Sequence, residues 1–256
     1  IKGLGFFLGG ALLAVFGFEG AVLGMACALG FLLTLVVWRM PPGLPSGMKG
    51  AKFSAVFSTS EAVNWLSLAR VFLFSARDVW FVVGVPLYFY GVWSDGSDAG
   101  NKAAFFMIGS FMALWVIGYG IVQGSAPKIL ARLPVQSAFA LAMLLAFVPL
   151  ILAIVLWLSS STVTPFVVIG LFVFGFGFAL NSALHSFLIL SFSTDARVSM
   201  DVGFYYMANA AGRLLGTLLS GVAYQAGGLE LCLLIASLML FLSAAVARRL
   251  PQSGVA

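Results

Sequence analysis

The sequence predicts an all-α integral membrane protein in which long apolar helices form a bundle. Of the 256 residues, 62% are hydrophobic and 8% are charged, and the mean hydropathy is +1.12, which lies far outside the range of soluble domains. Uninterrupted apolar runs such as residues 140–158 match the roughly 20 residues that a helix needs to cross a bilayer. A membrane β-barrel is not expected, because its strands would alternate apolar and polar side chains.

Glycine, proline and charged residues divide the apolar sequence into about eight predicted transmembrane helices. The first two occupy about residues 3–16 and 21–38, with a tight turn at Glu19 and Gly20 between them. A polar, proline-containing stretch at residues 39–61 is predicted to be a linker. The remaining helices are expected at about residues 62–92, 104–123, 136–158, 165–192, 202–224 and 230–247.

The basic residues predict the orientation of the helices, because lysines and arginines in short loops stay on the cytoplasmic side. With eight helices, one side of the membrane holds Lys2, Arg39, Lys49, Lys52, Lys128, Arg132, Arg197, Arg248 and Arg249. The opposite side holds Lys102 beside Glu19, Asp95, Asp98 and Glu230. Both ends of the chain are therefore expected in the cytoplasm. Because the basic residues are scattered over loop ends, no nucleic-acid-binding face is expected.

Two helices, a basic linker and six more helices form the pattern of a major facilitator bundle whose first four helices are missing. In that architecture two six-helix halves face each other around a site near the middle of the membrane. Residues 1–38 would then be the last two helices of the N-terminal half, and residues 39–61 the cytoplasmic linker. Residues 62–249 would form the complete C-terminal half, followed by a cytoplasmic tail at residues 250–256. The chain, which begins at Ile1, is expected to be a C-terminal fragment of a transporter.

The predicted third helix carries Arg70, Arg77 and Asp78, and an ionisable side chain inside a membrane costs at least about 2.5 kcal/mol. Arg70 is expected near the cytoplasmic interface, where its guanidinium can reach the headgroups. Arg77 is expected deeper, where it either holds an anionic substrate or forms an internal ion pair. Asp78 is expected either to pair with another helix or to carry a coupling proton.

In the predicted seventh helix Tyr206, Asn209 and Arg213 follow one another at spacings of three and four, which places them on one face. Arg213 lies near the middle of the helix and is expected to face the substrate cavity, with a structural role as the alternative. Tyr206 and Asn209 are expected to orient it or to contact substrate. A neighbouring strip of small residues predicts close helix packing: Ala208, Gly212, Gly216 and Ser220.

The predicted fourth and sixth helices supply further polar candidates. Asn181 is a candidate substrate contact, and His185 is either a carrier of the coupling proton or a neutral partner in an interhelical hydrogen bond. Tyr119 and Gln123 are spaced by four residues and either line the cavity or pack in the core. The single histidine, the lack of paired carboxylates and the lack of a glycine-rich phosphate loop predict no enzymatic activity, no cofactor and no metal site.

Three stretches of the sequence resemble one family, the ArsJ organoarsenical efflux permeases of the major facilitator superfamily. They are FLFSARDVWFVVGVPLYFY from Phe72, ALWVIGYGIVQGSAPKILAR from Ala113 and DVGFYYMANAAGRLLGTLLSG from Asp201. The resemblance extends from about Gly3 to Arg249. It departs from the family at residues 95–102, where a polar insert is expected to lengthen an external loop.

The resemblance implies a transporter of a bacterial inner membrane that exports 1-arseno-3-phosphoglycerate and so confers resistance to arsenate. It also implies a functional link to a glyceraldehyde-3-phosphate dehydrogenase that makes this anion. Arg77 and Arg213 suit such a substrate electrostatically. Proton antiport through Asp78 or His185 is a hypothesis for the energy source. The alternatives are an exporter of another small anion, a sugar or a drug, and a receptor or scaffold that transports nothing.

Overall fold

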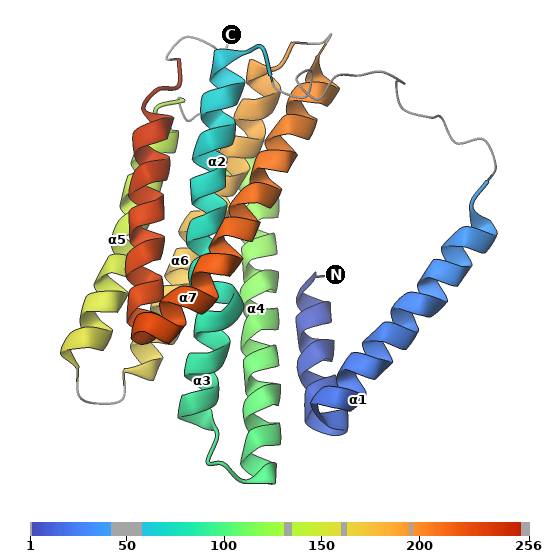
Figure 1. The fold of residues 1–256 in the computed structure, drawn as a ribbon. Helices are drawn as coiled ribbons and strands as arrows, with labels where there is room; N and C mark the ends of the chain where they lie inside the picture. Colours follow the sequence, from blue (N-terminus) through green and yellow to red (C-terminus); the bar gives the residue numbers. More distant parts are fainter. Residues whose placement is uncertain (1, 42–57, 131–134, 160–162, 195–196, 252–256) are drawn as a thin grey trace. The chain divides into compact units, whose positions relative to one another are not determined.

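The computed structural model describes residues 2–41, 58–130, 135–159, 163–194 and 197–251. Within these ranges the secondary structure is helical (Figure 1). The elements, in chain order, are α1 (Lys2–Arg39), α2 (Glu61–Val79), the π-helical segment η2 (Trp80–Gly84), α3 (Val85–Trp93), α4 (Asp98–Leu130), α5 (Ser137–Leu158), α6 (Thr164–Phe192) and α7 (Val198–Ala247). Most of the predicted linker at residues 39–61 lies outside the described residues, as does most of the predicted tail.

Five helices in the described ranges are long and apolar enough to cross a membrane, namely α1, α4, α5, α6 and α7. The chain is therefore a multi-pass, all-helical membrane protein, as the sequence predicts. The helix α2 is not among the five, because Glu61, Arg70, Arg77 and Asp78 lie within its 19 residues. The predicted number of eight helices stays a prediction.

Two of the long helices contain a break at glycine. In α1 the backbone turns at Gly17 (φ 69°), and in α7 it turns at Gly227 and Gly228, the second of which has a φ of 63°. A positive φ is accessible to glycine because it has no Cβ. The turn predicted at Glu19 and Gly20 is therefore misplaced by two to three residues, since both residues continue the helix after Gly17.

The loop after α3 is short, which corrects the expectation of a longer external loop at residues 95–102. Only residues 94–97 separate α3 from α4, because α4 already begins at Asp98. The hydroxyl of Ser97 accepts a hydrogen bond from the amide of Gly100 at 3.0 Å and so caps the first turn of α4. Asp95 accepts hydrogen bonds from the hydroxyl and amide of Ser97, which hold the pKa of its carboxyl below the ordinary value. Residues 98–102 of the insert therefore form the first turn of α4 and do not lengthen the loop.

The chain packs as two units. One consists of Ile1–Phe53 with Phe89–Val116, and the other of Ser54–Tyr88 with Ile117–Ala256. In the first unit a Cβ at Gly10 would lie 2.8 Å from the Cα of Gly109, so the two glycines let α1 and α4 approach closely.

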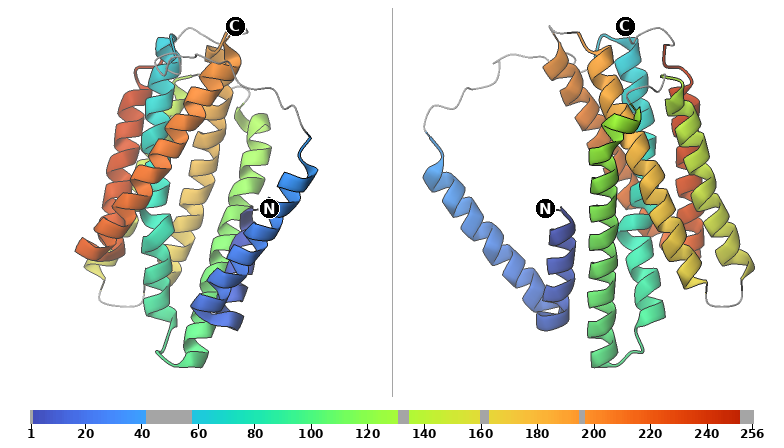
Figure 2. Two further views of the ribbon diagram at one scale, coloured as in Figure 1. Left: turned by 45° about the vertical axis from the view of Figure 1, so that its right-hand side comes forward. Right: turned by 180° about the vertical axis from the view of Figure 1, so that it is seen from behind.

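In the second unit α2 packs along α7, while α5 packs against α6 and α7 (Figure 2). Its core includes fully buried apolar residues of α2 and α6, among them Val63, Leu66 and Leu184.

The small-residue strip of α7 packs against α2, as the sequence predicts. A Cβ at Gly216 would lie 2.6 Å from the carbonyl oxygen of Ser75, a distance that no real side chain tolerates. A Cβ at Gly212 would likewise meet the backbone of Val71. The backbones of α2 and α7 can therefore lie this close only while these positions lack side chains.

Exchanging Gly216 for alanine should lower the free energy of unfolding by about 1 to 3 kcal/mol, because the new methyl group overpacks the α2–α7 contact. Gly221 is the matched control, since a Cβ there meets nothing within 4 Å. Gly221→Ala should be neutral or stabilising by up to about 1 kcal/mol, because alanine favours helix. Thermal unfolding of both variants in detergent measures the difference, and equal midpoints would contradict this packing.

Candidate functional site

The site is built on the seam between α2 and α7. The hydroxyl of Ser75 donates a hydrogen bond to the carbonyl of Gly212 at 2.7 Å. Beyond Asp78, the π-helical segment η2 interrupts the regular backbone pattern, and the amide of Val83 donates to the hydroxyl of Ser220 at 3.1 Å. Such π segments often lie next to functional residues. These two contacts fix α2 against α7 on both sides of Asp78.

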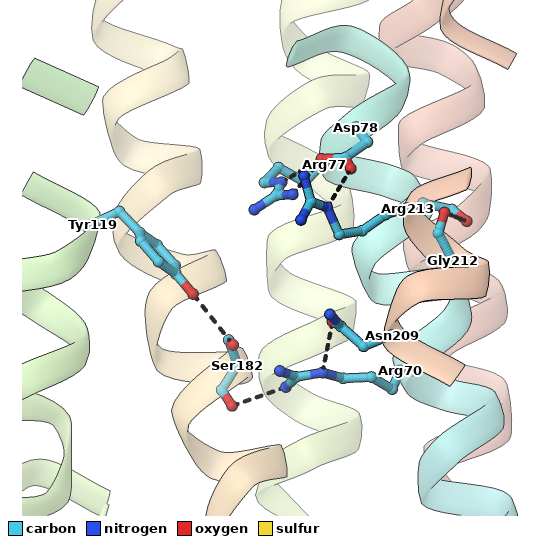
Figure 3. A network of polar contacts seen from close by, with 9 residues as sticks. Arg70, Arg77, Asp78, Tyr119, Ser182, Asn209, Gly212 and Arg213 are labelled. Atoms are coloured by element: carbon cyan, nitrogen blue, oxygen red, sulfur yellow. Dashed lines mark hydrogen bonds and ion pairs between the residues drawn. The ribbon is translucent and has the colours of Figure 1, made fainter. Parts of the chain in front are cut away.

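Asp78 is the shared partner of two arginines (Figure 3). Its carboxylate is 1% exposed and accepts hydrogen bonds from Nε of Arg77 at 2.6 Å and from Nε of Arg213 at 3.1 Å. One carboxylate oxygen serves each guanidinium. Asp78 thus pairs with a second helix, one of the two alternatives that the sequence left open, and Arg77 also takes part in an ion pair.

The two arginines differ in their surroundings. The Arg77 side chain is 14% exposed and lies near the rings of Phe74 and Phe178, whose centroids are 5.2 and 5.5 Å from its Cζ. The Arg213 side chain is 53% exposed. Within the described part of the chain Arg213 makes no polar contact other than that with Asp78, so its two terminal nitrogens are free to bind another group.

Arg70 lies inside the bundle, which corrects the expectation that it reaches the headgroups. It is 4% exposed, with Nε donating to Oδ1 of Asn209 at 3.2 Å and Nη1 donating to the carbonyl of Ser182 at 3.1 Å. The rings of Phe74 and Tyr205 lie 4.1 and 4.6 Å from its Cζ. The aromatic faces and carbonyl oxygens offset part of the cost of burying the charge. No carboxylate of the described residues forms an ion pair with it.

The polar residues of α7 are divided between different surroundings. Asn209 contacts Arg70, whereas the sequence placed it with Arg213. Tyr206 is 59% exposed, and its ring contacts that of Tyr205 at 5.7 Å between centroids. Helical spacing places Tyr206, Asn209 and Arg213 on one face of α7. The way α2 packs across α7 then decides which residue of α2 each of these side chains can contact.

Two of the predicted residues, both on α4, contact Ser182 of α6. Tyr119 and Gln123 both lie 3.4 Å from the hydroxyl of Ser182, whose carbonyl accepts the hydrogen bond from Arg70. Tyr119 also packs against Phe178. Both residues are therefore linked to Arg70 through Ser182 of α6, and Figure 3 shows this link for Tyr119.

Asn181 and His185 are fully buried one helical turn apart on α6. The amide of Asn181 donates to the carbonyl of Gly177 at 3.0 Å, while its Oδ1 has no hydrogen-bond partner among the described residues. Both ring nitrogens of His185 also lack such a partner. The interhelical hydrogen bond considered for His185 is thus absent from the described residues, and buried polar atoms of this kind call for a bound molecule or another conformation.

No protein-family model, no curated protein and no solved structure matches this chain. Within the described ranges no group of three histidine, cysteine or acidic side chains has the arrangement of a metal site.

Sequence reasoning did not find the aromatic surroundings of the arginines. Phe74 lies between Arg70 and Arg77 and contacts both of them. Tyr205 faces Arg70, although the sequence analysis selected its neighbour Tyr206. The spacing of four between Arg70 and Phe74 was a usable signal, because residues four apart meet on a helix. Nothing in the sequence distinguished Tyr205 from Tyr206.

Proposed function

We propose that this chain is part of a secondary transporter that exports a small organic anion through an arginine-lined site between α2 and α7. The observation that carries the proposal is the charge balance of the site. Among the described residues of the site, the three positive charges of Arg70, Arg77 and Arg213 are balanced by one negative charge, that of Asp78, which pairs with Arg77 and Arg213 but not with Arg70. Uncompensated positive charge at membrane depth is costly, and an anionic substrate would neutralise it.

The arginines offer two separate positive centres. Arg70 and Arg77 are seven residues apart on α2, which corresponds to about 10 Å along the helix axis. Arg213 joins Arg77 at one centre through Asp78, and Asn209 holds Arg70 at the other. Two centres suit a substrate with two anionic groups. This agrees with the 1-arseno-3-phosphoglycerate that the resemblance to the organoarsenical permeases implies, and with it a role in arsenate resistance. The major facilitator arrangement is proposed from the predicted order of two helices, a basic linker and six more helices.

The contacts of Asp78 argue against it as the carrier of an antiported proton. Protonation of Asp78 would release Arg77 and Arg213, and free guanidinium groups bind an anion more strongly. Binding of a proton at Asp78 would therefore raise the affinity of the site for an anion. Antiport requires the opposite, namely that binding of the proton lowers the affinity for the anion. We propose that Asp78 acts as an internal counter-ion and that His185 remains the candidate proton carrier. A membrane potential of 100 mV, negative inside, itself contributes about 2.3 kcal/mol per exported negative charge.

Everted membrane vesicles test the proposal. The complete open reading frame that contains this chain is expressed, and uptake of radiolabelled arsenate is followed with glyceraldehyde-3-phosphate and NAD, with and without glyceraldehyde-3-phosphate dehydrogenase. We expect uptake that depends on the dehydrogenase, because only the enzyme converts arsenate into the doubly anionic substrate. Vesicles without the protein, and vesicles given phosphate in excess over arsenate, are the controls.

Uptake of free arsenate at the same rate without the dehydrogenase would mean that the transported substrate is an inorganic anion and not the organoarsenical. Absence of uptake of any tested anion, combined with binding of a partner protein, would favour the receptor or scaffold alternative. Collapse of the membrane potential with a potassium ionophore should slow uptake, and collapse of the proton gradient alone should slow it only if a proton is exchanged for the substrate.

A further inference from the structure

A second basic feature lies away from the candidate site, at the end of the bundle where α5 begins and α7 ends. A cavity of about 610 Å³ is found there, lined by Phe139, Met143, Phe241, Ala245, Arg248 and Arg249. Phe139 belongs to the first turn of α5, and Arg248 directly follows the last residue of α7. The cavity therefore lies where apolar helix gives way to polar chain.

The cavity combines an apolar wall with two cations. Phe139, Met143, Phe241 and Ala245 supply the wall, and the Cζ of Arg248 lies 5.9 Å from the centroid of the Phe139 ring. Arg248 and Arg249 are both exposed. In the part of the chain that the structure describes, neither forms an ion pair with an acidic side chain, so both guanidinium groups are available to an anion.

We infer that this cavity binds one anionic phospholipid, with the phosphate on Arg248 and Arg249 and the glycerol and upper acyl chain along the apolar wall. Charge complementarity selects an anionic headgroup, since each arginine near a bilayer surface attracts anionic lipid by about 1 kcal/mol. The wall selects a lipid over a soluble anion, because a free phosphate gains nothing from Met143 or Phe241. Exposed Leu144 and Phe147 on the same helix α5 would contact acyl chains in a bilayer.

Arg39 provides a matched control for this site. It also ends an apolar helix and also lies against an aromatic ring, with its Cζ 5.5 Å from the centroid of Trp38. The cavity at Arg248 and Arg249 does not include it. General attraction of basic residues to an anionic membrane predicts equal effects of changing Arg39 or Arg248. A specific lipid site predicts that changing Arg248 or Arg249 weakens lipid binding, whereas changing Arg39 does not.

The test uses the complete natural protein purified in a neutral detergent. Phosphatidylglycerol or phosphatidylcholine is added, and native mass spectrometry counts the lipids that stay bound while thermal unfolding reports stabilisation. We expect one retained phosphatidylglycerol and a higher unfolding midpoint. The exchange Arg248→Gln with Arg249→Gln should weaken this binding about fivefold for each arginine. Arg39→Gln should leave it unchanged.

Two further arms separate the possible sources of the anion. Ala245→Phe narrows the cavity but keeps both arginines, and it should weaken retention of the lipid without lowering the unfolding midpoint of lipid-free protein. Glycerol 3-phosphate supplies the headgroup chemistry without acyl chains and should not compete at equal concentration. Equal retention of phosphatidylcholine, full competition by glycerol 3-phosphate, or unchanged retention in the Ala245→Phe variant would each overturn the inference.

Discussion

Vesicles that carry the Arg213→Gln variant should take up the arsenylated substrate about 10 to 100 times more slowly than vesicles with the unchanged protein. Arg213 offers two terminal nitrogens that no described residue occupies, and a charge-assisted hydrogen bond is worth about 1.5 to 3 kcal/mol. Glutamine keeps a similar length but loses the charge and the paired donors of guanidinium. Initial uptake rates measured with the dehydrogenase present check this prediction.

The Arg213 variant should still fold, because the side chain is 53% exposed and Asp78 keeps its second partner, Arg77. An unchanged unfolding midpoint is therefore the required control. Arg39→Gln, at the end of α1, should transport normally. If Arg213→Gln folds and transports at the normal rate, the substrate does not use this arginine, and the site between α2 and α7 would be a purely structural ion-pair cluster.

The exchange Asp78→Asn should have the largest effect on stability. It leaves Arg77 and Arg213 without their shared carboxylate, and removing one partner of a buried pair costs about 3 to 5 kcal/mol. A bound anion would replace the lost counter-ion. We therefore expect the variant to unfold at a lower temperature than the unchanged protein, and to be stabilised more strongly than that protein by the same concentration of a small organic phosphate.

Thermal unfolding with and without 3-phosphoglycerate measures both parts of this prediction. Asp95→Asn is the matched control, because Asp95 is exposed in the loop before α4 and contacts Ser97 there. A variant that is destabilised but gains no extra stabilisation from the anion would show that Asp78 only holds helices together. A variant as stable as the unchanged protein would show that the ion pairs contribute little.

The charge pattern of α2 was the most informative part of the sequence for the site. Arg77, Asp78 and Arg213 were selected because ionisable residues are costly inside a membrane, and the structure brings all three together. The sequence did not show that Arg70 is buried. The position of Arg70 along α2 suggested the interface, but α7 covers it with Tyr205 and Asn209, and α6 adds the carbonyl of Ser182.

The turns between helices were predictable in part. Gly227 and Gly228 fall in the predicted gap before Glu230, and glycine can adopt the positive φ that the break at Gly228 requires. In α1 both Gly17 and Gly20 could supply the turn, and local sequence did not decide between them. At residues 95–102 polarity suggested a loop, yet the Ser97 cap allowed the helix to start at Asp98.

By itself, the sequence determined that this chain is a multi-pass helical membrane protein. Composition and apolar run length are sufficient for this, because lipid permits little except long helices whose backbone groups are satisfied internally. Only the tertiary structure decided which arginine pairs with Asp78 and which lies against Tyr205 and Asn209. Those contacts depend on how closely α2 and α7 approach at Gly212 and Gly216, and periodicity along one helix carries no information about the helix that packs across from it.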